Sequence, residues 1–138
     1  MYLFDTDVIT NILKPRPNAF LIDKLGSVKQ SEQYISTITV MEIVYGAMKS
    51  DRSEYHLQNL EEILLPSVNV ASFDSKAAHV CGQLRASLEK RGQMISLADL
   101  EIAAIAWAND FTLITGNTKH FKRIESLKLE NWLVQDEG

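Results

Sequence analysis

The sequence contains very little cysteine and no long apolar segment. A single cysteine, Cys81, excludes an intrachain disulfide and a zinc site built from several thiolates. No apolar run approaches the ~20 residues that are needed to cross a bilayer. Residues 1–5 (MYLFD) include no basic leader and reach an acidic residue at once. We therefore expect no signal peptide, no association with a membrane and a cytoplasmic location.

The sequence also lacks an excess of positive charge. Its formal net charge is −4, whereas most nucleic-acid-binding proteins are basic because phosphate neutralisation dominates their affinity. This balance argues against a basic surface that covers the whole molecule. It remains compatible with nucleic-acid binding if several acidic residues form one metal site and the basic residues cluster elsewhere.

The composition is that of one globular domain. Hydrophobic residues make up 46% of the 138-residue chain and charged residues 23%, which provides enough apolar material for a core. The sequence shows no internal repeat, low-complexity segment or linker. We therefore expect a single domain over residues 1–138.

Short apolar segments alternate with segments of helical periodicity. We predict strands at residues 2–5, 34–38, 68–70, 112–115 and 127–129. We predict helices at residues 6–14, 18–28, 39–48, 53–65, 74–90 and 96–109. This alternation indicates an α/β fold with a parallel sheet that is covered on both faces.

Four polar residues lie where such a fold would place a ligand site, beyond the carboxyl ends of its strands. Asp5 ends the first strand, Glu42 lies in the first turn of the helix after the second strand, and Asn117 follows the strand that ends at Thr115. Asp99 lies in the first turn of the Ala-rich helix. Asp99 joins the other three only if that helix begins at the same edge of the sheet, which the sequence does not fix.

Each of these residues also has a structural explanation. Residues 39–42 (TVME) and 96–99 (SLAD) fit capping boxes. Asp5 fits a helix cap and Asn117 fits a turn. For each residue taken alone the structural explanation is favoured, but a carboxylate in the first turn of a helix can serve both purposes.

The four residues taken together indicate a metal site. Carboxylates that are brought together repel one another, and a hard cation relieves that repulsion. Mg²⁺ and Mn²⁺ prefer oxygen ligands, and water and substrate phosphate complete their coordination. No histidine is among the four residues, which argues against zinc.

Five segments resemble the PIN-domain ribonucleases of the VapC type, the toxins of VapBC toxin–antitoxin pairs. These segments are residues 3–7 (LFDTD), 36–47 (STITVMEIVYGA), 96–104 (SLADLEIAA), 113–121 (LITGNTKHF) and 129–132 (LENW). The resemblance extends over nearly the whole chain. It implies a three-layer α/β/α PIN-like fold with a central parallel sheet. It also implies Mg²⁺- or Mn²⁺-dependent endonuclease activity on RNA, with transfer RNA or another structured RNA as substrate.

The resemblance also implies which residues form the catalytic site. By position, Asp5, Glu42 and Asp99 are the expected metal ligands. Asn117 falls where many relatives have a fourth acid, and it is expected to orient water or phosphate. Asp7 stands where many relatives have asparagine. It either restores the missing negative charge or favours the N-terminus of the first helix, and the second interpretation is preferred.

Residues next to the proposed site are candidates for substrate binding. The candidates are Thr6, Asp7, Thr115, Lys119, Lys122 and Arg123. The basic members belong to a cluster that directly follows Asn117 and would bind an RNA backbone. The structural alternatives are solvated basic residues near helix ends and threonine hydroxyls in core or capping roles.

The resemblance implies protein partners as well. A VapB-like antitoxin would block the active site, and the toxin would form a homodimer and a larger complex with the antitoxin on DNA. Gly46, one turn beyond Glu42, either leaves room for close approach by another chain or packs against a neighbouring element. Apolar residues of the first two helices either line an antitoxin groove or belong to the core; they are Ile9, Ile12, Leu13 and Leu21.

Two other functions compete with the ribonuclease. Residues 5–7 (DTD) after a strand resemble the nucleophile motif of haloacid dehalogenase phosphatases. We find no convincing distal acidic pair of the kind which that family requires. The other alternative is a non-catalytic interaction domain on a PIN-like scaffold, and the complete set of Asp5, Glu42 and Asp99 argues against it.

Overall fold

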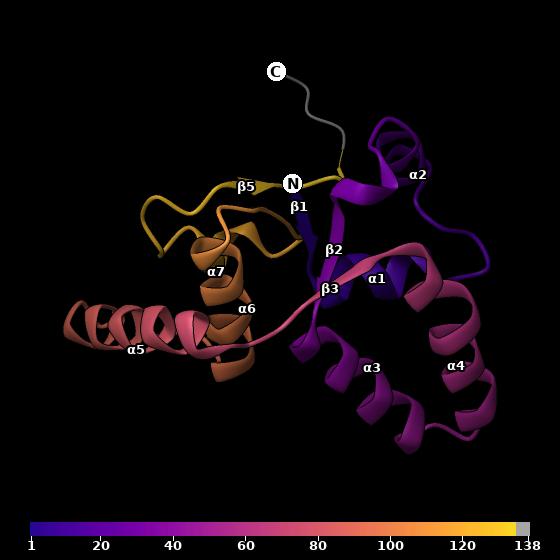
Figure 1. Cartoon of the computed structure of the whole chain (residues 1–138), viewed down its shortest axis with the longest axis horizontal. Helices are drawn as coiled ribbons and strands as arrows, with labels where there is room; N and C mark the ends of the chain where they lie inside the picture. Colours follow the sequence, from indigo (N-terminus) through magenta and orange to yellow (C-terminus); the bar gives the residue numbers. More distant parts are fainter. Residues whose placement is uncertain (135–138) are drawn as a thin grey trace.

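The computed structural model describes residues 1–134 and contains a parallel sheet in the order β3-β2-β1-β4-β5 (Figure 1). Every paired neighbour in this sheet is parallel. The strands are β1 (Tyr2–Phe4), β2 (Gln33–Ser36), β3 (Asn69–Ala71), β4 (Thr112–Ile114) and β5 (Leu129–Glu130). Within residues 1–134, no helix combines the length and the apolar character that a membrane span requires.

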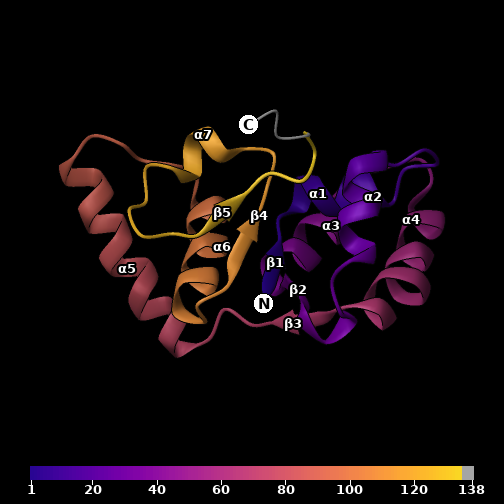
Figure 2. The ribbon, with the colours of Figure 1, turned by 90° about the horizontal axis from the view of Figure 1, so that it is seen from above.

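Helices cover both faces of the sheet (Figure 2). One side carries α1 (Thr6–Ile12), α2 (Ala19–Gly26), α3 (Thr37–Lys49) and α4 (Ser53–Asn59). The other side carries α5 (Ser75–Lys90) and α6 (Leu97–Ala108). These layers confirm the predicted α/β fold with its central parallel sheet and helices on either face.

Two apolar clusters hold the layers together. Consecutive residues of a strand point to opposite faces, so Leu3 and Leu113 belong to the cluster under α5 and α6, whereas Phe4 and Ile114 belong to the cluster under α1 and α2. All four side chains are almost fully buried. Burial on both faces explains why these strands appear in the sequence as continuous apolar runs.

The strand order places the proposed site at a change of direction in the sheet. The chain passes from β1 to β2 and β3 on one side, then crosses to β4 and β5 on the other. Ligands bind at the carboxyl ends of the strands at such a switch point, which here lies between β1 and β4. Asp5 and Thr115 are the first residues after these two strands.

The start of α3 differs from the prediction. Ser36 ends β2 and caps α3, because its Oγ accepts a hydrogen bond from the backbone N–H of Thr39 at 3.0 Å. The helix therefore begins at Thr37, and the predicted capping box at residues 39–42 is wrong. Glu42 lies in the second turn of α3 and is available for another role.

Other differences concern short elements. The helix predicted at residues 53–65 ends at Asn59, and a π-helical turn (Leu60–Leu64) and a 3₁₀ turn (Leu65–Ser67) follow it. Two short helices were not predicted, a 3₁₀ turn (Gln30–Glu32) and α7 (Thr118–Phe121). The last strand is β5, which begins two residues after the predicted start at residue 127.

Candidate active site

Asp5 occupies the junction between β1 and α1. Its backbone N–H donates to the carbonyl of Ile114 at 2.9 Å, which holds the junction against β4. Its Oδ1 accepts from the backbone N–H of Thr6 at 2.8 Å, so Asp5 caps α1 as expected. The residue is only 6% exposed. A carboxylate has about four lone-pair sites, so this capping bond leaves capacity for further ligands.

Thr115 connects the end of β4 to this carboxylate. Its hydroxyl donates to Oδ2 of Asp5 at 2.8 Å and accepts from the backbone N–H of Asn117 at 2.9 Å. The side chain is fully buried. A fully satisfied buried hydroxyl holds its neighbours in one geometry, so Thr115 fixes both Asp5 and the backbone that carries Asn117.

Asp7 is the second carboxylate at this edge. Its Oδ2 accepts from the backbone N–H of Gly116 at 2.9 Å. A Cβ added to Gly116 would lie 2.8 Å from that oxygen and 2.8 Å from Cδ1 of Leu133. The absence of a side chain at residue 116 therefore permits the backbone to approach Asp7. Asp7 lies in the first turn of α1, so it also occupies the helix position that the sequence suggested.

Glu42 reaches the same region from α3. Its Oε1 accepts from the hydroxyl of Thr6 at 2.7 Å, which ties the second strand–helix unit to the first. Thr6 directly follows Asp5. Asp5 is therefore one of the carboxylates at this edge, and its neighbour Thr6 holds another, that of Glu42. The structure thus brings Glu42 to the edge that the parallel sheet predicted.

Asp99 joins this edge because α6 begins there. Ser96 caps α6, and its Oγ accepts from the backbone N–H of Asp99 at 3.2 Å. Burial is the largest cause of the raised pKa of Asp5 and of Asp7, and the negative charge of Asp99 contributes to both shifts. This answers the question that the sequence left open about the position of α6.

The crowded carboxylates resist ionisation. Burial raises the pKa of Asp5 from 3.8 to about 7, and the charges of Asp7 and Asp99 add to that rise. Burial also raises the pKa of Asp7, and Asp99 contributes again. Hydrogen bonds from Thr115 and the Thr6 N–H lower the pKa of Asp5, and the Gly116 N–H lowers that of Asp7, but the net shifts are upward.

The donor set suits a hard cation in its chemistry. Asp5, Asp7, Glu42 and Asp99 offer only oxygen atoms, as Mg²⁺ and Mn²⁺ prefer. Over residues 1–134, however, no three Asp, Glu, His or Cys side chains already form a compact metal site. Mg²⁺ commonly takes one or two protein carboxylates, with water and phosphate as its other ligands, so it does not require three carboxylates in a compact cluster. The chemistry of these residues therefore fits such a cation.

Asn117 directly precedes α7, and the basic residues lie on α7 and on the segment after it. The side-chain Nδ2 of Asn117 lies 3.0 Å from Nδ1 of His120. Lys119 and Lys122 are exposed. Arg123 has a structural role, because its guanidinium donates to the carbonyl of Met94 at 2.8 Å. That bond ties the segment after α7 to the loop that leads into α6.

Sequence reasoning missed two features of this site. Gly116 was not singled out, although an isolated glycine directly after a strand is a recognised signal for close backbone approach. The role of Ser36 and Thr39 was also missed, because Thr39 was assigned to a cap one turn too late. Ser36 follows an apolar strand and precedes the helical pattern by one residue, which is the position of an N-cap.

An apolar groove lies between α1, α3 and α4. Its volume is about 350 Å³, and its lining includes Thr10, Leu13, Ile43, Gly46 and Tyr55. Of the four apolar residues that the sequence left open, Ile9 and Leu21 are fully buried core residues, and Leu13 lines the groove. Nothing lies within 4 Å of a Cβ built on Gly46, which agrees with open space above this residue.

Comparison with known proteins gives consistent matches over nearly the full chain. The family model described as PIN domain matches residues 2–127. Ribonuclease VapC2 of Rickettsia felis is 35% identical over 132 residues, which cover 96% of this chain and 98% of the relative. The tRNA(fMet)-specific endonuclease VapC of Shigella flexneri is 30% identical and covers 95% of this chain and 97% of its own. The crystal structure of VapBC2 from Rickettsia felis, bound to a DNA fragment from their promoter, aligns with a TM-score of 0.88 at 35% identity, over 95% of this chain and 98% of that chain.

Proposed function

Because this chain belongs to the PIN-domain family and, within it, to the VapC proteins, we propose that it is a metal-dependent endoribonuclease toxin. Its substrate is a structured RNA, with transfer RNA as the preferred class, since a relative is named for transfer RNA cleavage. The family match over residues 2–127 removes the phosphatase interpretation of residues 5–7.

One observation supports this activity most strongly. The carboxyl edge of the sheet gathers acidic side chains from separate segments: Asp5 is hydrogen-bonded to Thr115 after β4, and Glu42 of α3 is hydrogen-bonded to Thr6. Burial raises the pKa of Asp5, and the charges of Asp7 and Asp99 add to that rise. Burying several acidic groups together lowers stability unless a cation neutralises their charge. Proteins retain such clusters mainly at functional sites. Asp5, Glu42 and Asp99 are the proposed ligands of Mg²⁺ or Mn²⁺.

A bound cation would supply positive charge for the phosphodiester and lower the pKa of a coordinated water. The residues of the chain hold this arrangement in place. Thr115 fixes one oxygen of Asp5, and Thr6 fixes one oxygen of Glu42. The Nδ2 of Asn117 faces His120, which leaves its side-chain carbonyl as the proposed acceptor for water.

The basic residues after Asn117 are the proposed contacts for the RNA backbone. Lys119 and Lys122 are exposed and lie within five residues of Asn117, so their ammonium groups are available to phosphate. Thr6, Thr115, Asp7 and Arg123 act indirectly in this proposal. They shape the carboxylate edge and the adjoining loop through the hydrogen bonds described above.

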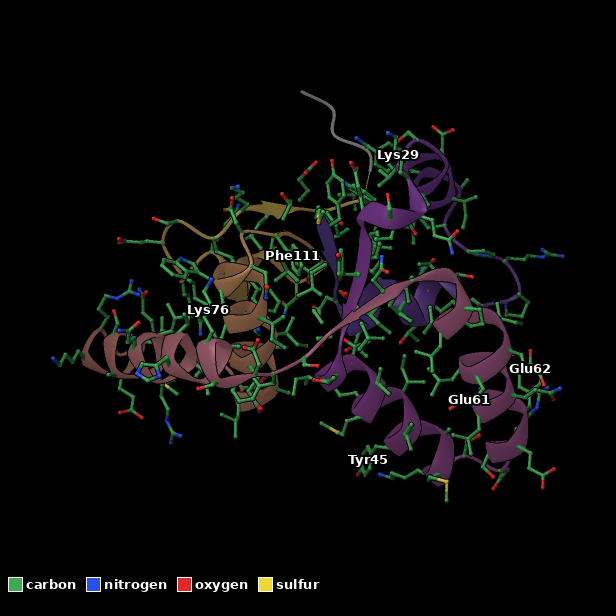
Figure 3. All side chains as sticks on the ribbon, viewed as in Figure 1. Lys29, Tyr45, Glu61, Glu62, Lys76 and Phe111 are labelled. Carbon is green, nitrogen blue, oxygen red and sulfur yellow. The ribbon has the colours of Figure 1, made fainter. Side chains whose placement is uncertain are left out.

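The proposed protein partner is a VapB-like antitoxin, with assembly on DNA as in the related VapBC2 complex. The groove between α1, α3 and α4 suits an apolar segment with acidic groups, because Lys14, Arg52 and His56 join its apolar lining. The outer face of α3 exposes Met41, Tyr45 and Met48, and Figure 3 shows Tyr45 on that face. This face is the proposed contact for homodimer formation.

Cleavage assays test the activity. Purified protein with Mg²⁺ or Mn²⁺ should cut a transfer RNA mixture, and excess chelator should stop the reaction. Asp99→Asn should lose at least about 100-fold in rate, whereas Asp23→Asn, at an exposed site on α2, should leave the rate unchanged. A folded protein that binds RNA without cutting it under any of these metals would support the non-catalytic interaction domain instead.

A further inference from the structure

We propose that Thr39 is a positioning residue that holds the Glu42 carboxylate for metal binding through a chain of three hydroxyl groups. The proposal rests on the proposed function, because it concerns how one ligand of the cation site is aimed. Thr39 belongs to the first turn of α3, one turn before Glu42, and its side chain is fully buried.

The chain of hydroxyl groups joins the ends of two strands that are distant in sequence. The Ser36 hydroxyl lies 3.2 Å from the Thr39 hydroxyl, and the Thr39 hydroxyl lies 3.0 Å from that of Thr6. The Thr6 hydroxyl lies 2.7 Å from Oε1 of Glu42. Ser36 ends β2, whereas Thr6 begins α1 after β1, so the chain spans the two neighbouring strands.

Proton counting fixes the direction of every link. An ionised carboxylate only accepts, so Thr6 must donate its single hydroxyl hydrogen to Glu42. Thr6 must therefore accept from Thr39, which uses up the hydrogen of Thr39. Thr39 must in turn accept from Ser36, in agreement with the donor that the geometry gives for that link. The three hydroxyl groups thus have one arrangement in which every donor is used.

Burial and backbone contacts make this arrangement rigid. Ser36 and Thr39 are both 0% exposed, so water does not compete for their hydroxyl groups. Ser36 also accepts from the backbone N–H of Thr39, which anchors the start of the chain to α3. The Thr6 hydroxyl, the last of the three, then fixes Oε1 of Glu42 and with it the direction of the second carboxylate oxygen.

Thr39 is the central link, because its hydroxyl contacts both the Ser36 hydroxyl and the Thr6 hydroxyl. Replacing its hydroxyl by a methyl group removes the donor to Thr6 and frees the Thr6 hydroxyl to rotate. Glu42 would then reach the cation with a less defined orientation. Partners that orient metal ligands commonly contribute about 10–100-fold to metal affinity or activity.

A neighbouring threonine provides a matched control. Thr37 lies on the same turn of α3, and its Oγ1 accepts from the backbone N–H of Phe73 at 3.2 Å. Thr37→Val therefore removes one hydroxyl hydrogen bond from the same helix turn without touching the chain to Glu42. A role of Thr39 that was merely structural would give similar results for the two valine variants.

The test measures Mn²⁺ affinity by calorimetry on the full chain in the absence of RNA. Thr39→Val should weaken binding about tenfold, Thr39→Ser should restore it to within about threefold, and Thr37→Val should leave it unchanged. Thermal unfolding of each variant confirms that it is folded. If Thr39→Val fails to fold, the partly exposed Thr6→Val cuts the last link directly and should show the same tenfold loss.

A double variant tests whether Thr39 acts on Glu42 through Thr6. If Thr39 acts through Thr6, adding Thr39→Val to Thr6→Val should cause no further loss of Mn²⁺ affinity. Additive losses, or unchanged affinity in Thr39→Val or in Thr6→Val, would overturn the proposal. Failure of the wild-type protein to bind Mn²⁺ would instead overturn the proposed function, so the two failures are distinguishable.

Discussion

Thr115 donates its hydroxyl hydrogen to Oδ2 of Asp5 at 2.8 Å, although 110 residues separate them in the chain. The bond exists because β1 and β4 are parallel neighbours whose carboxyl ends meet at one edge. It connects the first carboxylate of the site to the loop that carries Gly116 and Asn117. The position of Asp5 thus depends on two separate segments, and changes in either should affect the proposed cleavage.

Removing the Thr115 hydroxyl should impair the site more than the fold. Thr115→Val deprives Asp5 of a donor and leaves the Asn117 N–H without its acceptor. We expect cleavage to fall about tenfold or more, with a stability loss of about 1–3 kcal/mol. Thr115→Ser should recover most of the activity. Thr112→Val, on the same strand, is the control, and an equal activity loss there would contradict the assigned role.

The stability of the metal-free protein should depend on pH through Asp5. The folded pKa of about 7 exceeds the ordinary 3.8, so between these values the folded state binds more protons than the unfolded state. Stability from this group is therefore present at low pH and is lost as pH rises through that window. In the presence of chelator, the free energy of unfolding of Asp5→Asn should rise relative to that of the wild type between pH 4 and pH 7, by about a few kcal/mol at most.

Chemical denaturation at several pH values measures that difference. Because Asn keeps a capping oxygen, the variant retains the α1 cap. Its amide NH2 faces the Thr115 hydroxyl in place of Oδ2, so the charge effect is taken from the difference in pH dependence and not from the absolute stability. Adding Mg²⁺ at pH 7 should stabilise the wild type and not Asp5→Asn. If the free energies of unfolding of the two proteins change in parallel between pH 4 and pH 7, the pKa of Asp5 is not raised in the folded state.

A methyl group at residue 116 should displace Asp7. The new Cβ would lie 2.8 Å from Oδ2 of Asp7 and 2.8 Å from the end of the Leu133 side chain. Both are ends of flexible side chains, so Gly116→Ala should cost about 1 kcal/mol or less in stability. We expect a several-fold loss of cleavage because the carboxylate cluster is rearranged. Gly82→Ala, where a Cβ meets nothing within 4 Å, should preserve activity, and full activity in Gly116→Ala would contradict this account.

A larger side chain at Gly46 should separate partner binding from catalysis. Gly46 lines the groove between α1, α3 and α4, and a Cβ built there meets nothing within 4 Å. Gly46→Leu should therefore fold and cut RNA at the wild-type rate, but should bind at least about tenfold more weakly to a VapB-like antitoxin that inhibits the wild type. Gly82→Leu on α5 is the control. Unchanged inhibition of Gly46→Leu would place the antitoxin elsewhere.

The sheet and its ligand edge were predictable because they depend on local patterns. Leu3, Phe4, Leu113 and Ile114 form short apolar runs of the kind that parallel strands require. The strand order then brings Asp5 and Thr115 together. The sequence could not show that α6 begins at the same edge, since that depends on packing between α5, α6 and the sheet, so the position of Asp99 needed the structure.

Other features were beyond sequence reasoning because they depend on contacts between distant residues. Asp7 was predicted mainly as a helix-terminus residue, and only the structure shows the Gly116 N–H on its carboxylate. Glu42 was predicted as a metal ligand with a capping box as its structural alternative, but its contact with the Thr6 hydroxyl, 36 residues away, needed the structure. The substrate roles of Lys119 and Lys122 remain predictions, since exposure alone does not define an RNA contact.

Anomalous diffraction from crystals grown with Mn²⁺ tests the central claim most directly. The account predicts a Mn²⁺ peak at the carboxyl edge of the sheet, with oxygen atoms of Asp5 and Asp99 within about 2.2 Å and Glu42 bound directly or through water. The peak should disappear in Asp5→Ala crystals grown in the same way. A Mn²⁺ ion bound elsewhere, or an edge that stays empty at saturating Mn²⁺, would contradict the assignment of these carboxylates as the metal site.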